Sequence, residues 1–104
     1  MRNVESFASV LSQWAASTPS VRRVWVFGSV AKNKDNPRDL DVAVELDAAE
    51  PILFWIDHAP KWRSKLQALL PIPLDLEYFD PQGSTPTISK GLSEAKHLVY
   101  ERTS

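Results

Sequence analysis

Apolar residues recur along this chain at two spacings, and these separate expected helices from expected strands. From Val4 to Ala16 they return every three or four residues, as on one face of an amphipathic helix. The runs 21–27 and 40–46 are short, rich in β-branched and aromatic residues and flanked by turn formers, which is typical of strands. Because residues 24–27 leave neither side polar, we predict that the first strand is central in its sheet.

The second half of the chain continues with helix, strand, helix and strand. A helical repeat runs through residues 51–70, but Pro60 interrupts it, because a proline inside a helix removes a hydrogen bond and clashes with the preceding turn, at a cost of about 3 kcal/mol. We therefore expect two helices or a sharp kink, with the break between Asp57 and Pro60. The later pattern predicts a strand at 74–79, a surface loop at 80–87, a helix at 88–96 and an edge strand or tail at 97–101.

This order of elements predicts an α/β (α+β) fold in which a mixed sheet of three to four strands packs against helices. At 104 residues the chain is expected to form one domain, 1–104, with a real core and no room for a second lobe. An activity that needs two lobes would have to take the second from another chain.

Composition narrows the possible functions. With 12 Lys and Arg against 13 Asp and Glu, the net charge of −1 predicts no general affinity for DNA or for anionic membranes. The absence of cysteine excludes disulfides, thiolate metal sites and thiol catalysis. No long apolar run and no signal-peptide pattern is present, so we expect a soluble cytoplasmic protein without a membrane segment.

Candidate chemistry is concentrated between the first two expected strands. Asp39 and Asp41, one residue apart on a strand, point to the same side about 6.6 Å apart along the chain, which suits shared divalent cations. Gly28 and Ser29 form a turn before a short expected helix, residues 30–32, and such a turn aims backbone N–H groups and the helix dipole at an anion such as phosphate. Turn formers fill 33–37. Together these features indicate metal-assisted phosphoryl chemistry on a nucleotide.

The third expected strand supplies a further carboxylate. It repeats the pattern of the second strand and places Asp75 and Glu77 on one side, and either of them could complete the site. Glu45 shares a side with Asp41, but we interpret it as a solvated strand end.

The order of these motifs resembles the nucleotidyltransferase superfamily that includes DNA polymerase beta, and more narrowly its minimal branch, MNT. The resemblance spans residues 20–101 and is strongest in Phe27-Gly-Ser and Asp39-Leu-Asp41, while Leu74-Asp-Leu76 fits the strand of the third carboxylate. It implies a palm-like sheet and favours Asp75 over Glu77.

The resemblance also implies roles for the candidate residues. Asp39 and Asp41 would hold two Mg²⁺ ions, and Asp75 would complete the metal site on the attacking side or accept the proton. Gly28 and Ser29 would cradle the β and γ phosphates of ATP, where a side chain at Gly28 would block close approach.

Basic residues near the turn are candidates for contacts with the triphosphate. Lys32, Lys34 and Arg38 could make them or could be ordinary solvated charges, and Lys32 is favoured because relatives often carry a basic residue there. The loop 31–38 departs from the usual family sequence, which leaves its phosphate contacts open.

By this resemblance the protein is a Mg²⁺-dependent nucleotidyltransferase that moves AMP from ATP onto a hydroxyl. Family members of this size commonly act as antitoxins that adenylylate a tyrosine of a helical HEPN ribonuclease toxin. Two alternatives stay open: a non-catalytic antitoxin that neutralises its partner by binding, and a nucleotidyltransferase that modifies a small molecule.

The remaining aromatic residues and histidines are expected to serve the structure. Phe54 and Trp55 are adjacent on a helix and cannot both face the core, so one of them is a candidate partner contact. Core packing is expected for Trp14, Trp25 and Trp62, and structural or solvent-facing roles for His58 and His97.

Overall fold

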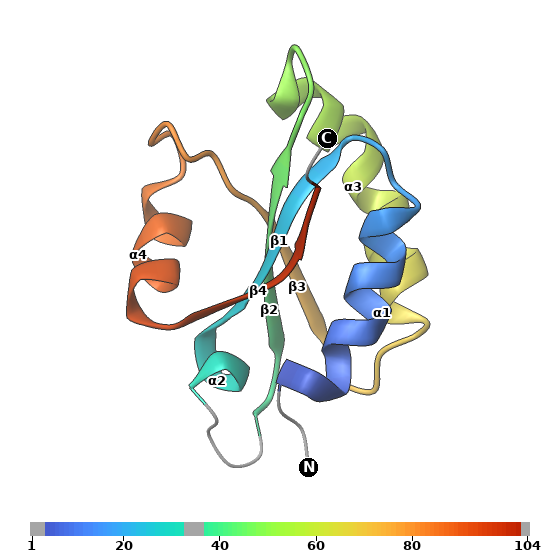
Figure 1. Cartoon of the computed structure of the whole chain (residues 1–104), viewed down its shortest axis with the longest axis vertical. Coiled ribbons are helices and arrows are strands. Elements are labelled where there is room, and N and C mark those ends of the chain that lie inside the picture. Colours follow the sequence, from blue (N-terminus) through green and yellow to red (C-terminus); the bar gives the residue numbers. More distant parts are fainter. Residues whose placement is uncertain (1–3, 33–36, 103–104) are drawn as a thin grey trace.

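A computed structural model describes residues 4–32 and 37–102 (Figure 1). In these residues a four-stranded mixed sheet is combined with four helices, which confirms the predicted fold class. The elements are α1 Val4–Ala16, β1 Val21–Phe27, α2 Gly28–Ala31, β2 Leu40–Leu46, α3 Pro51–Gln67, β3 Leu74–Tyr78, α4 Pro86–Glu94 and β4 Lys96–Glu101.

The strands are arranged in the order β3-β2-β1-β4. β1 is antiparallel to both β2 and β4, so its predicted central place is confirmed. β2 and β3 are parallel neighbours, and α3 makes the crossover that a parallel pair requires.

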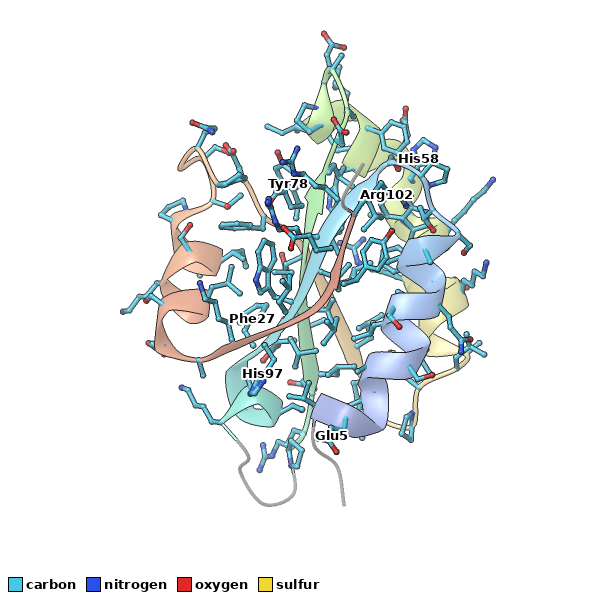
Figure 2. The ribbon with its side chains drawn as sticks, in the orientation of Figure 1. Glu5, Phe27, His58, Tyr78, His97 and Arg102 are labelled. Carbon is cyan, nitrogen blue, oxygen red and sulfur yellow. The ribbon has the colours of Figure 1, made fainter. Side chains whose placement is uncertain are left out.

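The main core lies between the sheet and the helices α1 and α3, which cover the same face (Figures 1 and 2). Alternate residues of the two central strands are fully buried there, since a strand sends every second side chain to one face. Trp14 and Trp62 join the two helices edge to face at 5.5 Å, as expected of core residues. Among the described helices, none combines the length and the apolar character needed to cross a membrane.

Helix α3 continues through Pro60 as one helix, so the predicted division into two helices is wrong. Pro60 is exposed, and so is Ile56, whose carbonyl loses its helical partner to the proline and can accept a hydrogen bond from water. On the opposite side Ala59, Trp62 and Leu66 are buried in the core. Burial on both sides of the proline therefore holds one helix together.

Smaller differences affect element ends. α4 begins at Pro86, two residues earlier than predicted, because a proline fits the first turn of a helix, where its missing N–H costs nothing. α2 begins at Gly28 rather than at residue 30. β3 ends at Tyr78 and β4 begins at Lys96, one residue from prediction in each case. Residues 33–36 of the predicted turn at 33–37 lie outside the described residues.

The second face of the sheet is only partly open. Helix α4 packs on it through Leu92, which forms a small cluster with Phe27 and Ala43. Trp25 is half-buried at this cluster and meets Phe79 edge to face at 5.2 Å. This cluster therefore covers part of the second face.

The last described residue, Arg102, ties the chain end to helix α1 (Figure 2). Its guanidinium donates to the carbonyls of Ala15 and Thr18, at 3.1 and 3.2 Å, and to that of Val21, at 3.2 Å. It thus satisfies carbonyls at the C-terminus of α1, where a positive charge also complements the helix dipole.

We predict that Arg102→Ala lowers the free energy of unfolding by about 1–3 kcal/mol, because charge-assisted hydrogen bonds to these carbonyls are lost. Urea unfolding measures the change. Arg102→Lys is the matched control, because it keeps the charge without the planar guanidinium. Its free energy of unfolding should lie between those of the wild type and Arg102→Ala. Equal stability of all three proteins would show that the hydrogen bonds of Arg102 do not contribute to the free energy of unfolding.

Candidate active site

The site begins where β1 ends against β2. Phe27 lies opposite Asp41 in the antiparallel register, and the chain then turns into α2 at Gly28, whose φ is +70°. A Cβ on Gly28 would collide with Oδ2 of Asp41 and lie 3.0 Å from its Cγ. Glycine is therefore required here by the Asp41 carboxylate as well as by the backbone conformation.

The parallel pairing of β2 with β3 brings two predicted carboxylates together. Asp41 lies directly opposite Asp75, while the exposed Asp39 immediately precedes β2. Burial, the charges of Asp75 and Asp39, and a hydrogen bond with Asp75 raise the pKa of Asp41 to about 6. The three predicted catalytic carboxylates are thus gathered at one end of the sheet, where their charges act on one another.

Glu77 belongs to the same cluster. A hydrogen bond with Asp75, burial and the charges of Asp75 and Asp41 raise its pKa to about 7, against the opposing charge of Arg63. Asp75 therefore lies between two carboxyl groups and contacts both. It also faces Asp41, whereas Glu77 faces Ala43 in the register.

The predicted nucleotide-binding residues flank this cluster on the side of β1. Ser29 is half-buried as the second residue of α2. Lys32 follows that helix, and its Nζ lies 3.4 Å from Oε1 of Glu94 on α4. Arg38 is exposed, and Lys34 lies outside the described residues. Contacts of any of them with a triphosphate stay predictions.

The donor set suits Mg²⁺, although in residues 4–32 and 37–102 no three His, Cys, Asp or Glu side chains form a ready metal cage. Mg²⁺ usually binds one or two carboxylates together with substrate phosphates and water. Burial raises the pKa of Asp41, and the nearby charges of Asp75 and Asp39 raise it further. Asp39, Asp41 and Asp75 therefore fit a divalent cation that arrives with a nucleotide.

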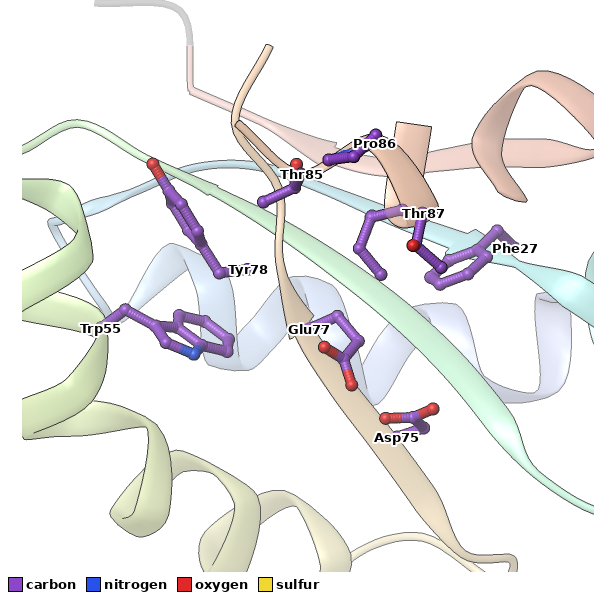
Figure 3. A pocket seen from close by; sticks show the side chains of 9 residues that line it. Phe27, Trp55, Asp75, Glu77, Tyr78, Thr85, Pro86 and Thr87 are labelled. Carbon is purple, nitrogen blue, oxygen red and sulfur yellow. The ribbon is translucent and has the colours of Figure 1, made fainter. Parts of the chain in front are cut away.

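Beside the carboxylates the surface forms a cavity of about 530 Å³ (Figure 3). The Asp75 and Glu77 carboxylates lie side by side in it, with the Trp55 and Tyr78 rings toward one end and Phe27 and Thr87 toward the other. The volume lies in the range of small-ligand sites. Its lining comes from four elements and one loop: Phe27, Trp55, Asp75, Glu77, Tyr78, Thr85, Pro86, Thr87 and Ile88.

Two local arrangements shape the cavity walls. Arg63 lies 5.7 Å from the centroid of the Trp55 ring and donates to the carbonyl of Leu76 at 3.2 Å, which fixes α3 against β3. Asp80 accepts from the backbone N–H groups of Gln82 and Ser84, and these bonds shape the loop that leads to α4. The Ser84 and Gln82 hydrogen bonds also lower the pKa of Asp80.

The sequence identified this cavity only in part. Phe54 and Trp55 both pack against the core, so the expectation that they could not both face it is wrong. Trp55 also lines the cavity, and Phe54 stacks on His58 at 4.0 Å. Thr85 and Thr87 were missed, because hydroxyl residues in a segment that the sequence predicts as a loop carry no distinguishing pattern. His58 and His97 lie far apart, as Figure 2 shows. The Nδ1 of His58 is 2.9 Å from the carbonyl of Phe54.

The interpretation of Glu45 as a solvated strand end is wrong. Its exposed fraction is 7%, and its carboxylate pairs with Arg23 at 3.0 Å and Arg22 at 3.3 Å. Arg23 also binds Glu101 of β4 at 2.7 Å. Glu45 is therefore a structural ion-pair residue at the far end of the face.

Comparisons with known proteins identify the fold. No family model and no curated protein matches the chain. A crystal structure of a toxin–antitoxin with AMP-PNP matches with a TM-score of 0.60 and 17% identity, over 92% of this chain and 74% of that one. A rebuilt structure of the tri-AMPylated Shewanella oneidensis HEPN toxin in complex with MNT antitoxin matches with a TM-score of 0.56 and 17% identity. The match covers 94% of this chain and 69% of that one. A crystal structure of the toxin–antitoxin MntA–HepT matches with a TM-score of 0.55 and 16% identity, over 94% of this chain and 69% of that one.

The chain has the fold found in these solved toxin–antitoxin structures. The match confirms the expected mixed sheet packed against helices, and at 16–17% identity it shows a shared fold alone. Within this fold, the carboxylate cluster and the turn at Gly28 are features of this chain's own geometry.

We predict that Gly28→Ala displaces the Asp41 carboxylate. The matched control is Gly83→Ala, because Gly83 also has a positive φ, +106°, but a Cβ there meets nothing within 4 Å. Both variants should lose about 1–2 kcal/mol of stability from backbone strain. Only Gly28→Ala should change the titration of Asp41, followed by carboxyl ¹³C NMR. An unchanged Asp41 titration in Gly28→Ala would contradict the packing described here.

The carboxylate cluster predicts how stability depends on pH. Because the pKa values of Asp41 and Glu77 are raised in the folded state, the folded chain binds more protons than the unfolded chain between about pH 4 and 7. Stability should therefore fall as pH rises through this range. Asp41→Asn and Glu77→Gln should raise Tm at pH 8, and the gain should disappear near pH 4.

Thermal unfolding from pH 4 to 8 in EDTA measures this effect. Asp57→Asn is the control, since Asp57 is an exposed carboxylate on α3. If Asp41→Asn and Glu77→Gln change Tm no more than Asp57→Asn does, the carboxylates do not repel one another in the folded protein.

Proposed function

We propose that this chain is a Mg²⁺-dependent nucleotidyltransferase that moves AMP from ATP onto a hydroxyl of a partner protein. We further propose that the acceptor is a tyrosine of a helical HEPN-type toxin and that the chain acts as its antitoxin. One observation carries this proposal: the fold brings Gly28, Asp41 and Asp75 into contact at one end of the sheet.

Helix α2 would bind the triphosphate of the AMP donor, ATP. Its first residues follow directly on β1 beside the Asp41 carboxylate. Backbone N–H groups of Gly28 and Ser29 would bind the β and γ phosphates, with Lys32 near enough in sequence to add a charge. The short distance to Asp41 would place the α phosphate at the carboxylates.

The carboxylates would have two roles, metal binding and proton acceptance. Asp39, Asp41 and Asp75 would hold Mg²⁺, which supplies charge neutralisation for the leaving pyrophosphate and activation of the attacking hydroxyl. Glu77 contacts Asp75 and has a pKa of about 7, so this pair can accept the proton that the acceptor hydroxyl loses.

A protein partner is supported by the surface of α3. Its first turns expose Ile52, Leu53 and Ile56 at 53%, 57% and 61%. A contiguous apolar group of this kind is typical of a protein interface. The structural neighbours include complexes of an MNT antitoxin with a HEPN toxin, which supports the same class of partner. The apolar group also favours the second candidate, neutralisation by binding without catalysis.

We predict that, with labelled ATP and Mg²⁺, label is transferred to the product of the adjacent gene, which we expect to be a helical HEPN-type protein. Asp39→Asn combined with Asp41→Asn should reduce the label at least a hundredfold. The protein should stay folded, because Asp39 is exposed and Asp41→Asn removes repulsion. Asp47→Asn with Asp57→Asn, two exposed carboxylates outside the cluster, is the matched control.

Each outcome separates the candidates. If the Asp39/Asp41 double variant transfers no label yet protects cells as well as wild type, the chain neutralises its partner by binding. Label that appears only in a low-molecular-weight product would favour a small-molecule acceptor. Undiminished label on the partner would overturn the assignment of the two aspartates.

A further inference from the structure

Strand β4 is the last strand at one side of the sheet. Within residues 4–32 and 37–102 no strand pairs with its outer edge. Figure 1 shows β4 between α1 and α4, which pack on opposite faces of the sheet. Lys96, His97 and Leu98 are exposed on this strand. An edge strand of this kind presents backbone N–H and C=O groups that can pair with a strand of another chain.

We propose that β4 pairs with β4 of a second copy of this chain, antiparallel and about a two-fold axis. The two four-stranded sheets would then form one continuous sheet across the dimer. This inference does not depend on the proposed nucleotidyl transfer. It goes beyond that function, because it assigns an interface to a strand that does not line the cavity.

The register between β4 and β1 contains a bulge that sets which side chains share a face. Trp25 lies opposite Leu98 and Val24 lies opposite Tyr100, so Val99 is an extra residue on β4. Apart from Val99, the side chains of β4 alternate between the two faces of the sheet. Lys96, Leu98 and Glu101 belong to the second face, and His97 and Tyr100 to the core face.

This order of side chains is complementary to itself. With the two-fold axis at Leu98, this residue lies opposite Leu98 of the second copy, Lys96 opposite Glu101, and His97 opposite Tyr100. Directly opposite residues of an antiparallel pair lie on the same face, and all three pairs meet this condition. Because a two-fold interface contains each contact twice, the dimer gains two ion pairs around an apolar centre.

The charges at the two ends of β4 select this register. An axis at His97 or at Tyr100 would place a charged side chain opposite Leu98, and an axis at Lys96 or Glu101 would place like charges opposite each other. Like charges directly opposite on neighbouring strands are destabilising. Arg23 contacts Oε2 of Glu101 at 2.7 Å, which holds this carboxylate at the sheet while 40% of the side chain stays exposed. Glu101 is thereby available to Lys96 of the second copy.

Sedimentation over a concentration series measures the dissociation constant of the dimer. Leu98→Lys places two positive charges opposite each other at the axis and should raise this constant at least tenfold. The variant should stay folded, because 48% of Leu98 is exposed. Leu69→Lys is the matched control, since Leu69 is 59% exposed beyond the end of α3 and should leave the constant within twofold.

Exchange of the charges tests the register itself. Lys96→Glu sets two acidic side chains opposite each other, and Glu101→Lys sets two basic ones, so each variant alone should dimerise at least tenfold more weakly at low ionic strength. An equimolar mixture of the two variants regains both ion pairs and should form heterodimers. With one variant labelled with ¹⁵N, native mass spectrometry identifies the heterodimer by its mass.

The outcomes separate this interface from other surfaces. If the mixture dimerises no more tightly than either variant alone, the proposed register is wrong. If Ile56→Lys breaks the dimer and Leu98→Lys does not, the copies meet at α3 and the proposal fails. A wild-type chain that stays monomeric up to about 1 mM also overturns it. If Leu98→Lys then weakens binding of the helical partner, β4 is a surface for that protein instead.

Discussion

The contact between the Asp41 carboxylate and the backbone of Gly28 is the constraint on which the site depends. Gly28 follows β1 and begins α2, so its positive φ determines where the chain leaves the sheet. The missing side chain leaves the space that the Asp41 carboxylate fills. Because Asp41 lies opposite Asp75, one glycine aligns the turn into α2 with the carboxylates of two further strands.

The two ends of the same sheet face differ in whether their carboxylates are paired with positive charges. At one end Glu45 is buried between Arg22 and Arg23, so its charge is matched within the chain. At the other end Asp41 meets Asp75 and Asp39, and these charges raise the pKa of Asp41. A fold selected for stability alone would not gather these groups, since their repulsion opposes folding at neutral pH. The unmatched charge is consistent with a site built to receive a cation and a nucleotide.

The sequence predicted well those parts of the molecule that local pattern determines. Alternation at Leu40–Leu46 and the β-branched run at Val21–Phe27 identified both central strands and the side of the sheet that carries Asp41. The division into two helices predicted at Pro60 does not occur, because burial of Trp62 and Leu66 outweighs one lost hydrogen bond on the exposed side. The cavity could not be predicted, because its walls come from segments that only the tertiary structure brings together.

The arrangement of this face bears on where the donor and the partner of the proposed reaction would bind. Helix α4 covers part of the face through Leu92, and its first turn lines the cavity. Under the proposed function, the donor would bind on the β1 side of Asp41, next to the turn at Gly28. The exposed apolar turns of α3 adjoin Trp55 in sequence, so a protein bound there would lie beside the cavity that Trp55 lines. A partner in this position would supply both the acceptor and the outer wall of the site.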